Sequence, residues 1–220
     1  MANVDIFERM ADHYNANDQR IATMHLIAQE IAASLDAVSS NAHAARNATP
    51  SAGDAATPAA LDFGCGTGVI GCDVATQVAT LDMVDASAAM IDVTNERIAS
   101  LGVTNAQTYC IDIEHGGTLP HTYDVIWISQ TLLHMSDTAA TLRVLCGALK
   151  PNGQLIVVDF DPVISDVAGV HHGFSRPELA DALSSLGMYD ISFRTIYEAD
   201  NLLLGQHATL FLLSALKAHA

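Results

Sequence analysis

Residues 61–68 read Leu-Asp-Phe-Gly-Cys-Gly-Thr-Gly, an apolar run that ends in three alternating glycines. The apolar part is typical of a β-strand, and the residues that follow the glycines are typical of a helix. Glycine adopts backbone angles that other residues avoid, and it lets a ligand contact the backbone closely. The stretch therefore predicts a strand, a tight turn that can hold a ligand, and a helix.

The spacing of the glycines separates two classes of ligand. Dinucleotide-binding turns carry the pattern GxGxxG, which places a pyrophosphate at the helix N-terminus. Here the glycines stand at positions 64, 66 and 68, and Val69 occupies the place of the last glycine in that fingerprint. The pattern GxGxG disfavours a nicotinamide cofactor, and the sequence shows no evident Tyr-Lys pair for hydride transfer.

Two acidic residues stand at the ends of the next two expected strands. Asp85 lies 21 residues after Gly64, where a carboxylate can accept hydrogen bonds from two ribose hydroxyls. Asp112 would lie near the exocyclic amine of an adenine, with Ile113 against the ring. Because ligands of open α/β sheets bind at the carboxyl ends of the strands, these residues indicate an adenosine-type ligand there.

Strand-like and helical segments alternate through the rest of the chain. Such alternation predicts a mostly parallel sheet with helices on both faces. The expected strands are residues 59–63, 81–85, 108–112, 124–128, 154–158, 191–197 and 208–215, and the expected helices are 88–101, 138–149 and 177–186.

The chain opens with helical sequence and continues into a low-complexity segment. Apolar residues recur at helical spacing from Ile6 to Leu35, which predicts two helices, with Asp18 as the N-cap of the second. Residues 37–60 are rich in alanine and small polar residues. They can extend the helix toward Arg46 but must break it at Pro50, so we expect a mobile segment here.

The composition excludes several classes of partner. With 50% hydrophobic and 15% charged residues the chain can bury a core, so we expect it to fold. The formal net charge of −16 repels nucleic-acid backbones and anionic lipids. No segment predicts a membrane span, and the first residues lack a secretory pattern. We therefore expect a cytoplasmic protein without nucleic-acid or membrane partners.

The four cysteines, Cys65, Cys72, Cys110 and Cys146, form no CxxC pair. Wide spacing of this kind suits reduced thiols better than disulfides or a zinc site. We expect no structural metal, and we expect Cys65 and Cys110 to be packed thiols. Trp127 is expected in the core, and Asp62 and Asp124 in structural roles.

In order and spacing, the motifs between Pro58 and Asp159 resemble the class I S-adenosylmethionine-dependent methyltransferases of the small-molecule type. Tyr14, in the helical opening, resembles the N-terminal lid of that family. The segment His171–Phe174 and the run Phe211–Leu213 resemble features of one type of member. The matching segments are residues 61–68, 84–90, 112–113, 123–129, 133–134 and 149–155.

The resemblance implies a Rossmann-like, doubly wound sheet of seven strands, mostly parallel with the last strand antiparallel, with helices on both faces and an N-terminal helical lid. It implies S-adenosylmethionine as the cofactor and methyl transfer by direct displacement at the sulfonium. The 220 residues would then form one domain. Its parts would be a lid (1–36), an alanine-rich connection (37–60), a cofactor-binding core (58–159) and an acceptor side with the last two strands (160–220).

Carried over residue by residue, the resemblance also implies a cofactor site. The glycine turn would approach the methionine part, Asp85 the ribose, and the residues after Asp85 and Asp112 the adenine. The carbonyl of Ser129 would receive the methionine amino group, and the lid would cover the cofactor. The cofactor-binding residues expected on this basis are Tyr14, Arg20, Gly64, Cys65, Gly66, Thr67, Asp85, Ala86, Met90, Asp112, Ile113 and Ser129.

Candidates for a catalytic base are less constrained by the sequence. An imidazole suits proton removal from an acceptor near neutral pH. His172, in a glycine-containing loop, and His134, after the fourth strand, are the two candidates, each weighed against a purely structural role. Asp159 and Asp161, beyond the fifth strand, are alternatives.

Three functions remain open at this level. The first is a methyltransferase acting on a small molecule, alone or as a homo-oligomer. The second is a catalytically silent protein that binds S-adenosylmethionine or S-adenosylhomocysteine. The third is a nicotinamide-dependent oxidoreductase, which the glycine spacing disfavours. The acceptor and its reacting atom, whether oxygen, nitrogen, carbon or sulfur, are not determined by the sequence.

Overall fold

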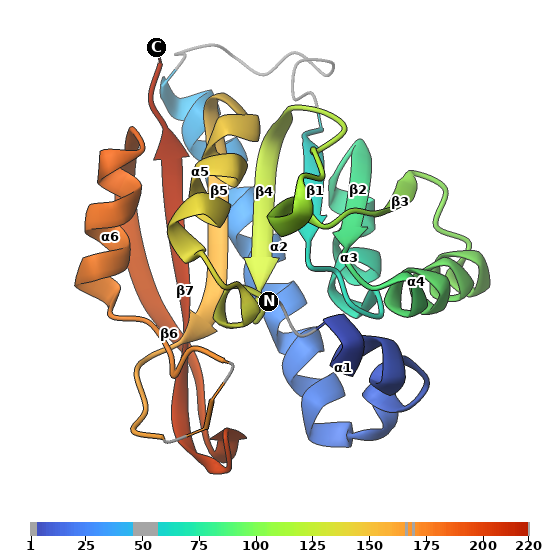
Figure 1. Ribbon diagram of the computed structural model, residues 1–220. Coiled ribbons are helices and arrows are strands. Elements are labelled where there is room, and N and C mark those ends of the chain that lie inside the picture. The colour runs from blue at the N-terminus through green and yellow to red at the C-terminus, as the bar shows by residue number, and fades with distance from the viewer. Residues whose placement is uncertain (1–3, 46–56, 166, 169, 220) are drawn as a thin grey trace.

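The chain folds around one mixed β-sheet (Figure 1). This computed structural model describes residues 4–45, 57–165, 167–168 and 170–219. The strands lie in the order β3-β2-β1-β4-β5-β7-β6, and β7 is antiparallel to both of its neighbours while the others run parallel. This confirms the expected seven-stranded sheet with an antiparallel last strand. The strands are β1 (Ala59–Phe63), β2 (Thr80–Asp85), β3 (Ala106–Cys110), β4 (Tyr123–Ser129), β5 (Leu149–Phe160), β6 (Met188–Leu203) and β7 (Gln206–Lys217).

Helices cover both faces of the sheet, as expected for parallel strands joined by crossovers. Residues of α2 and α3 share one buried cluster with one face of the strands, and residues of α5 and α6 share a second cluster with the other face. The α-helices are α1 (Val4–Met10), α2 (Asp18–Ala45), α3 (Val69–Val74), α4 (Ala88–Leu101), α5 (Thr138–Ala148) and α6 (Arg176–Ser185). Short 3₁₀ helices are η1 (Ala11–Ala16), η2 (Ala75–Gln77), η3 (Ile113–His115) and η4 (Leu132–His134).

The middle of strand β4, residues 125–128, shows why a central strand carries an apolar run. Val125 and Trp127 belong to the cluster on one face, and Ile126 and Ile128 belong to the cluster on the other. Successive side chains of a strand point to opposite faces, so the part of a central strand that is covered on both faces is apolar at consecutive positions. Trp127 is fully buried, which confirms its expected place in the core.

Several expected element ends are wrong. The strands β5, β6 and β7 begin before and end after the expected ranges 154–158, 191–197 and 208–215. Two further differences have a local cause. Strand β3 ends at Cys110 rather than at Asp112, because it is paired in register with β2 and ends level with Asp85. Helix α2 is capped by Asn17 rather than by Asp18: the side-chain oxygen of Asn17 accepts from the backbone N–H of Arg20 at 2.9 Å. Asp18 is the first helical residue instead.

The alanine-rich sequence extends α2 as far as Ala45, in keeping with its small side chains. Residues 46–56, with Pro50 and the expected mobile segment, lie outside the described residues. None of the helices within the described ranges is both long enough and apolar enough to span a bilayer.

The chain order reverses between β1 and β4, which are neighbours in the sheet although the chain continues from them toward opposite edges. In open α/β sheets such a reversal leaves a crevice outside the carboxyl ends of the strands. Helix α1 and η1 lie at this end of the sheet (Figure 1). Glu8 of α1 accepts from the backbone N–H groups of Ala88 (2.7 Å) and Ala89 (3.3 Å) at the start of α4, which holds the N-terminal helices over the crevice.

Candidate functional site

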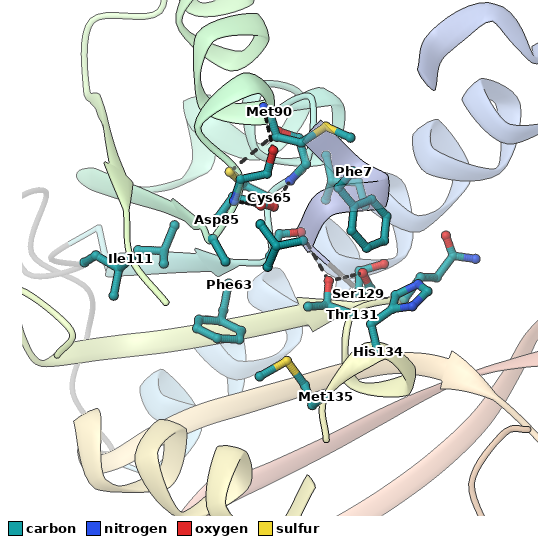
Figure 2. A pocket seen from close by; sticks show the side chains of 18 of the residues that line it. Phe7, Phe63, Cys65, Asp85, Met90, Ile111, Ser129, Thr131, His134 and Met135 are labelled. Atoms are coloured by element: carbon teal, nitrogen blue, oxygen red, sulfur yellow. Dashed lines mark hydrogen bonds between the residues drawn. The ribbon is translucent and has the colours of Figure 1, made fainter. Parts of the chain in front are cut away.

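A pocket occupies this crevice, between the carboxyl ends of β1 to β4 and the N-terminal helices. Most of the residues expected at the cofactor line it: Tyr14, Gly64, Cys65, Gly66, Asp85, Ala86, Met90, Asp112, Ile113 and Ser129, with His134 beside them. Arg20, Thr67 and His172 are not among the lining residues. Figure 2 shows Asp85 and Met90 in one part of the pocket and His134 with Met135 in another.

The glycine turn lines the part of the pocket that contains Asp85 and Met90. Its backbone is tied to β2, since Gly64 N–H donates to the carbonyl of Val84 at 2.7 Å. Gly64 (φ +73°) and Gly66 (φ +55°) have left-handed backbone angles, which glycine adopts without strain. At Gly66 a Cβ atom would meet no atom within 4 Å, whereas at Gly64 it would lie 2.3 Å from the side chain of Thr131. The turn therefore leaves open space at Gly66, where a ligand can approach.

Asp85, at the end of β2, organises this turn. Its carboxylate accepts from the backbone N–H of Gly66 and from that of Ser87, each at 2.9 Å. Burial raises the pKa of Asp85, and these two backbone donors oppose that shift. Each carboxylate oxygen retains a lone pair after these bonds, so Asp85 can also accept hydrogen bonds from a ligand.

Asp112 caps η3 from the loop after β3. One carboxylate oxygen accepts from Glu114 N–H at 2.9 Å, and the other lies 2.6 Å from Nδ1 of His115. Ile111 and Ile113, on either side of Asp112, also line the pocket. The arrangement places a carboxylate between two apolar side chains, which suits a flat ring with a polar edge.

The segment after β4 contains two pocket residues that the sequence reasoning missed. The Thr131 hydroxyl lies within hydrogen-bond distance of the carbonyls of Ser129 (3.0 Å) and Gly64 (3.2 Å) and shares its one hydrogen between them, so it bridges β4 to the glycine turn. Gln130 has a positive φ of 49°, a strained conformation that is frequent at functional sites. Their position directly after a strand that ends at the pocket is the signal that could have identified them.

The N-terminal helices supply aromatic side chains to the pocket. Burial raises the pKa of the Tyr14 hydroxyl, so this phenol stays protonated. Arg20 stacks its guanidinium 4.4 Å from the centre of the Tyr14 ring and donates to the Tyr14 carbonyl at 3.0 Å. Arg20 thus supports Tyr14 from behind rather than facing the pocket. The Thr67 hydroxyl is bonded to η1, because it donates to the Asn15 side chain at 2.8 Å.

The two candidate histidines are in different surroundings. His134 lines the pocket, and burial lowers its pKa to about 4, so its imidazole is neutral near pH 7. The Phe7 ring, which the sequence reasoning missed, meets it edge-on at 5.0 Å between centroids. His172 lies outside the lining, and its Nε2 is 2.6 Å from the carbonyl of Val167.

The acidic residues considered at the sequence level also lie outside the lining. Asp159 is fully buried, and burial raises its pKa to about 7. Asp161 forms a two-pronged ion pair with Arg176, with both N–O distances 2.7 Å. Asp124 accepts from Ala59 N–H (2.9 Å) and from the Lys150 ammonium (2.8 Å), a tie between strand ends away from the pocket.

The cysteines differ from one another in exposure. Cys65 is buried, and burial raises its pKa well above the usual range, as expected of a packed thiol. The expectation of a packed Cys110 is wrong, because its side chain is exposed at the end of β3, an outer strand of the sheet. In the described part of the chain, no three His, Cys, Asp or Glu residues are grouped so that they could hold a metal ion.

Comparison with known proteins agrees with this geometry. A family model described as a methyltransferase domain matches residues 56–187. Methyltransferase GfsG of Streptomyces halstedii is 28% identical over 136 residues, covering 59% of this chain and 48% of that protein. The mitochondrial ubiquinone biosynthesis O-methyltransferase of Schizosaccharomyces pombe is 33% identical over 98 residues, covering 44% and 36%. The matches thus span half or less of the length of these relatives.

Solved structures share the fold at low sequence identity. YcgJ of Bacillus subtilis has a TM-score of 0.61 at 17% identity, covering 75% of this chain and 94% of that one. The [4+2]-cyclase SpnF has a TM-score of 0.60 at 18% identity, covering 73% and 74%. A SAM-dependent methyltransferase of Aquifex aeolicus has a TM-score of 0.54 at 19% identity, covering 72% and 81%. Together with the family match over more than half of its residues, these likenesses show that the chain belongs to the methyltransferase domain family, with the class I fold of the S-adenosylmethionine-dependent enzymes.

Proposed function

We propose that this chain transfers a methyl group from S-adenosylmethionine to a small-molecule acceptor by direct displacement. The observation that carries the proposal is one pocket that contains both an adenosine-type end, at Gly66 and Asp85, and a largely apolar end that holds His134. Direct displacement requires that the methyl donor and the acceptor meet in line, and alignment alone supplies a large part of such a rate enhancement. A single pocket with two chemically different ends is suited to that task.

The residues present fit S-adenosylmethionine. Gly66 provides open space beside the backbone, and Asp85 and Asp112 are carboxylates with free lone pairs at the ends of adjacent strands. We assign Asp85 to the ribose hydroxyls and Asp112 to the adenine edge. Ala86, Met90 and Ile113 are assigned to the two faces of the adenine ring. When bound, the cofactor supplies an electrophilic methyl group on a sulfonium.

The methionine part is assigned to the other side of the turn, near Gly64 and Ser129. The Ser129 carbonyl already accepts from the Thr131 hydroxyl, and its second lone pair can accept from an ammonium group. Tyr14 covers the pocket from the lid, with Arg20 stacked behind it. In this assignment residues 4–36 form the lid and residues 58–159 the cofactor-binding core.

At the acceptor end, Phe7 and Met135 lie beside His134. Apolar walls with few polar groups favour a small acceptor with one reactive polar atom. The net charge of −16 favours an acceptor that is uncharged or cationic. Because His134 is neutral near pH 7, a ring nitrogen can accept the proton of the attacking group.

The names of the relatives support a small molecule without fixing the acceptor atom. One relative is an O-methyltransferase of ubiquinone biosynthesis, and another, from Haemophilus ducreyi, is a ubiquinone and menaquinone biosynthesis C-methyltransferase. These reactions methylate oxygen and carbon respectively, so both atoms are candidates here, and nitrogen and sulfur stay open.

The test is incubation of the chain with S-adenosylmethionine carrying a labelled methyl group and with pooled metabolites. We expect one low-molecular-mass compound to gain the label, with S-adenosylhomocysteine as the coproduct. A His134→Ala variant serves as the comparison, since it should bind S-adenosylhomocysteine and transfer the label more slowly.

A second candidate is a protein of this fold that binds the cofactor without methylating. The likeness to SpnF, which is named as a cyclase, shows that this fold also serves other reactions. Binding of S-adenosylhomocysteine by calorimetry with no labelled product in any pool would favour this candidate. A thermal shift with a nicotinamide dinucleotide but none with S-adenosylhomocysteine would contradict both.

A further inference from the structure

The η4 turn carries His134 into the pocket, yet it has few hydrogen bonds of its own. It is a 3₁₀ helix of three residues, Leu132–His134, between β4 and α5. Its internal bonds are His134 N–H to the carbonyl of Thr131 (2.9 Å) and Met135 N–H to that of Leu132 (3.1 Å). Short 3₁₀ segments have poorer hydrogen-bond geometry than α-helices. The position of His134 therefore depends on contacts from outside the turn.

The middle residue of the turn, Leu133, is held on both sides of its backbone. Its N–H donates to a carboxylate oxygen of Asp159, at the end of β5, at 3.3 Å. Its carbonyl accepts from the backbone N–H of His171 at 2.8 Å. Two segments that are distant in sequence thus form hydrogen bonds with the residue directly before His134.

His171 makes a second contact with the same segment. Its Nε2 lies 3.1 Å from the carbonyl of Met135, the residue directly after His134. Since the partner is a carbonyl, Nε2 carries the hydrogen and donates. The ring also lies against Phe174, with centroids 5.4 Å apart. His171 therefore contacts the chain before and after His134.

The loop that carries His171 is itself fastened to the end of β5. Phe174 N–H donates to the carbonyl of Phe160, and Val163 N–H donates to that of His172, both at 2.7 Å. Gly173 has a φ of +92°, and a Cβ at this position would lie 2.2 Å from the carbonyl of Asp161. Only glycine permits this approach, so the loop is closed tightly and His171 is presented to the turn.

The buried carboxyl of Asp159 has few hydrogen-bond partners. Its two carboxylate oxygens accept only from Leu133 N–H and from its own neighbour Phe160 N–H (2.9 Å) within the described part of the chain. A fully buried carboxyl is costly unless its hydrogen bonds compensate. Here one of the two bonds goes to the turn that carries His134.

We propose that Asp159 and His171 are positioning residues, which clamp the η4 turn and thereby hold His134 in the acceptor end of the pocket. The clamp acts on the backbone before and after His134 rather than on its imidazole. A displacement of about 1 Å in a positioned group can cost about a hundredfold in rate. That His134 faces a methyl acceptor rests on the proposed function, whereas the clamp itself does not.

The experiment follows the imidazole of His134 directly, by NMR titration of ring-labelled histidine with His134→Ala to assign the signal. In the native protein burial lowers the pKa of His134 to about 4. If the clamp is loosened, His134 gains access to water and its pKa rises by about one unit or more toward 6.5. This signal does not require the acceptor to be known.

Four variants distinguish the loss of the clamp contacts from a general loss of folded structure. His171→Ala removes the contact with Met135, and His171→Gln restores a donor at nearly the same reach. Asp159→Asn keeps the shape of the side chain but removes one of its two acceptors. His207→Ala, an exposed histidine near the β6–β7 turn, is the matched control.

We expect the pKa of His134 to rise in His171→Ala and Asp159→Asn, and to remain near the native value in His171→Gln and His207→Ala. Binding of S-adenosylhomocysteine, measured by calorimetry, should stay within about twofold in all four, because none of them contacts the glycine turn or Asp85. An unchanged His134 pKa in folded His171→Ala overturns the clamp. His171 is exposed, so this variant keeps the core intact even if Asp159→Asn fails to fold.

Discussion

Substitution of Gly66 by valine tests whether the glycine turn is shaped for a ligand or only for the fold. Gly66 has a φ of +55°, and a Cβ there meets no protein atom within 4 Å. Valine keeps the backbone N–H that donates to Asp85 and the carbonyl that accepts from the Thr94 hydroxyl at 2.7 Å. The fold should therefore accommodate the new side chain, which would project into the space that we assign to the cofactor.

The expected cost to stability comes from the backbone angle alone. A left-handed conformation costs a non-glycine residue about 1–2 kcal/mol, which corresponds to a fall in Tm of about 2–8 °C for a chain of this size. The effect on binding should be larger than the effect on stability. Two branched methyl groups in the ligand's space should weaken S-adenosylhomocysteine binding by about a hundredfold or more, or about 3 kcal/mol.

Gly102 offers a matched control. It caps the far end of α4 with a φ of +67°, and a Cβ there also meets no atom within 4 Å. Gly102→Val should show a similar fall in Tm by circular dichroism and unchanged S-adenosylhomocysteine affinity by calorimetry. Native affinity in Gly66→Val, with a folded spectrum, would refute the claim that the turn approaches the cofactor.

Three further changes test separate parts of the site. Asp85→Ala should weaken S-adenosylhomocysteine binding by about 1.5–3 kcal/mol, or about 10- to 140-fold, because a charge-assisted acceptor for hydroxyls is lost; unchanged affinity by calorimetry would remove the ribose assignment. His134→Ala should lower turnover with labelled cofactor by about a hundredfold with S-adenosylhomocysteine affinity unchanged. If His172→Ala lowers turnover and His134→Ala does not, His172 is the base and the assignment of His134 is contradicted. Burial raises the pKa of Asp62 to about 7, above its value of about 3.9 in the unfolded chain. The folded state therefore favours the protonated carboxyl, and the free energy of unfolding falls as pH rises from about 4 to about 7. The stability of Asp62→Asn relative to the native protein should therefore increase with pH across that window, by up to about 1.4 kcal/mol per pH unit in urea unfolding, and a constant difference would contradict the raised pKa.

Much of the fold could be predicted because it depends on local pattern. The glycine turn and the runs that became β1, β2 and β4 were placed to within one residue. The end of β3 was not, because it is set by pairing with β2 rather than by the sequence of β3 itself. Asn17 and Asp18 are both good capping residues, and the structure rather than composition chooses between them.

The candidate site divides in the same way. The approach of Asp85 to the glycine turn could be predicted because parallel strands end at one edge of a sheet, so residues at their ends converge. The contact between the Thr131 hydroxyl and the carbonyl of Gly64 could not be predicted. The two residues are 67 positions apart, and nothing in the local sequence constrains such a contact. Arg20 was expected at the cofactor, and the structure stacks it behind Tyr14.

By itself the sequence determined the alternation of strands and helices, the glycine turn after β1 and the carboxylate at the end of β2. These features follow from hydrophobic periodicity and from the backbone freedom of glycine, which are properties of neighbouring residues. Only the tertiary structure decided which histidine faces the pocket. His134 lines the pocket and packs edge-on against Phe7, whereas His172 bonds to a carbonyl of its own loop. The reason is that a side chain's surroundings, and with them its pKa and its access to a ligand, are set by packing between segments that are distant in the chain.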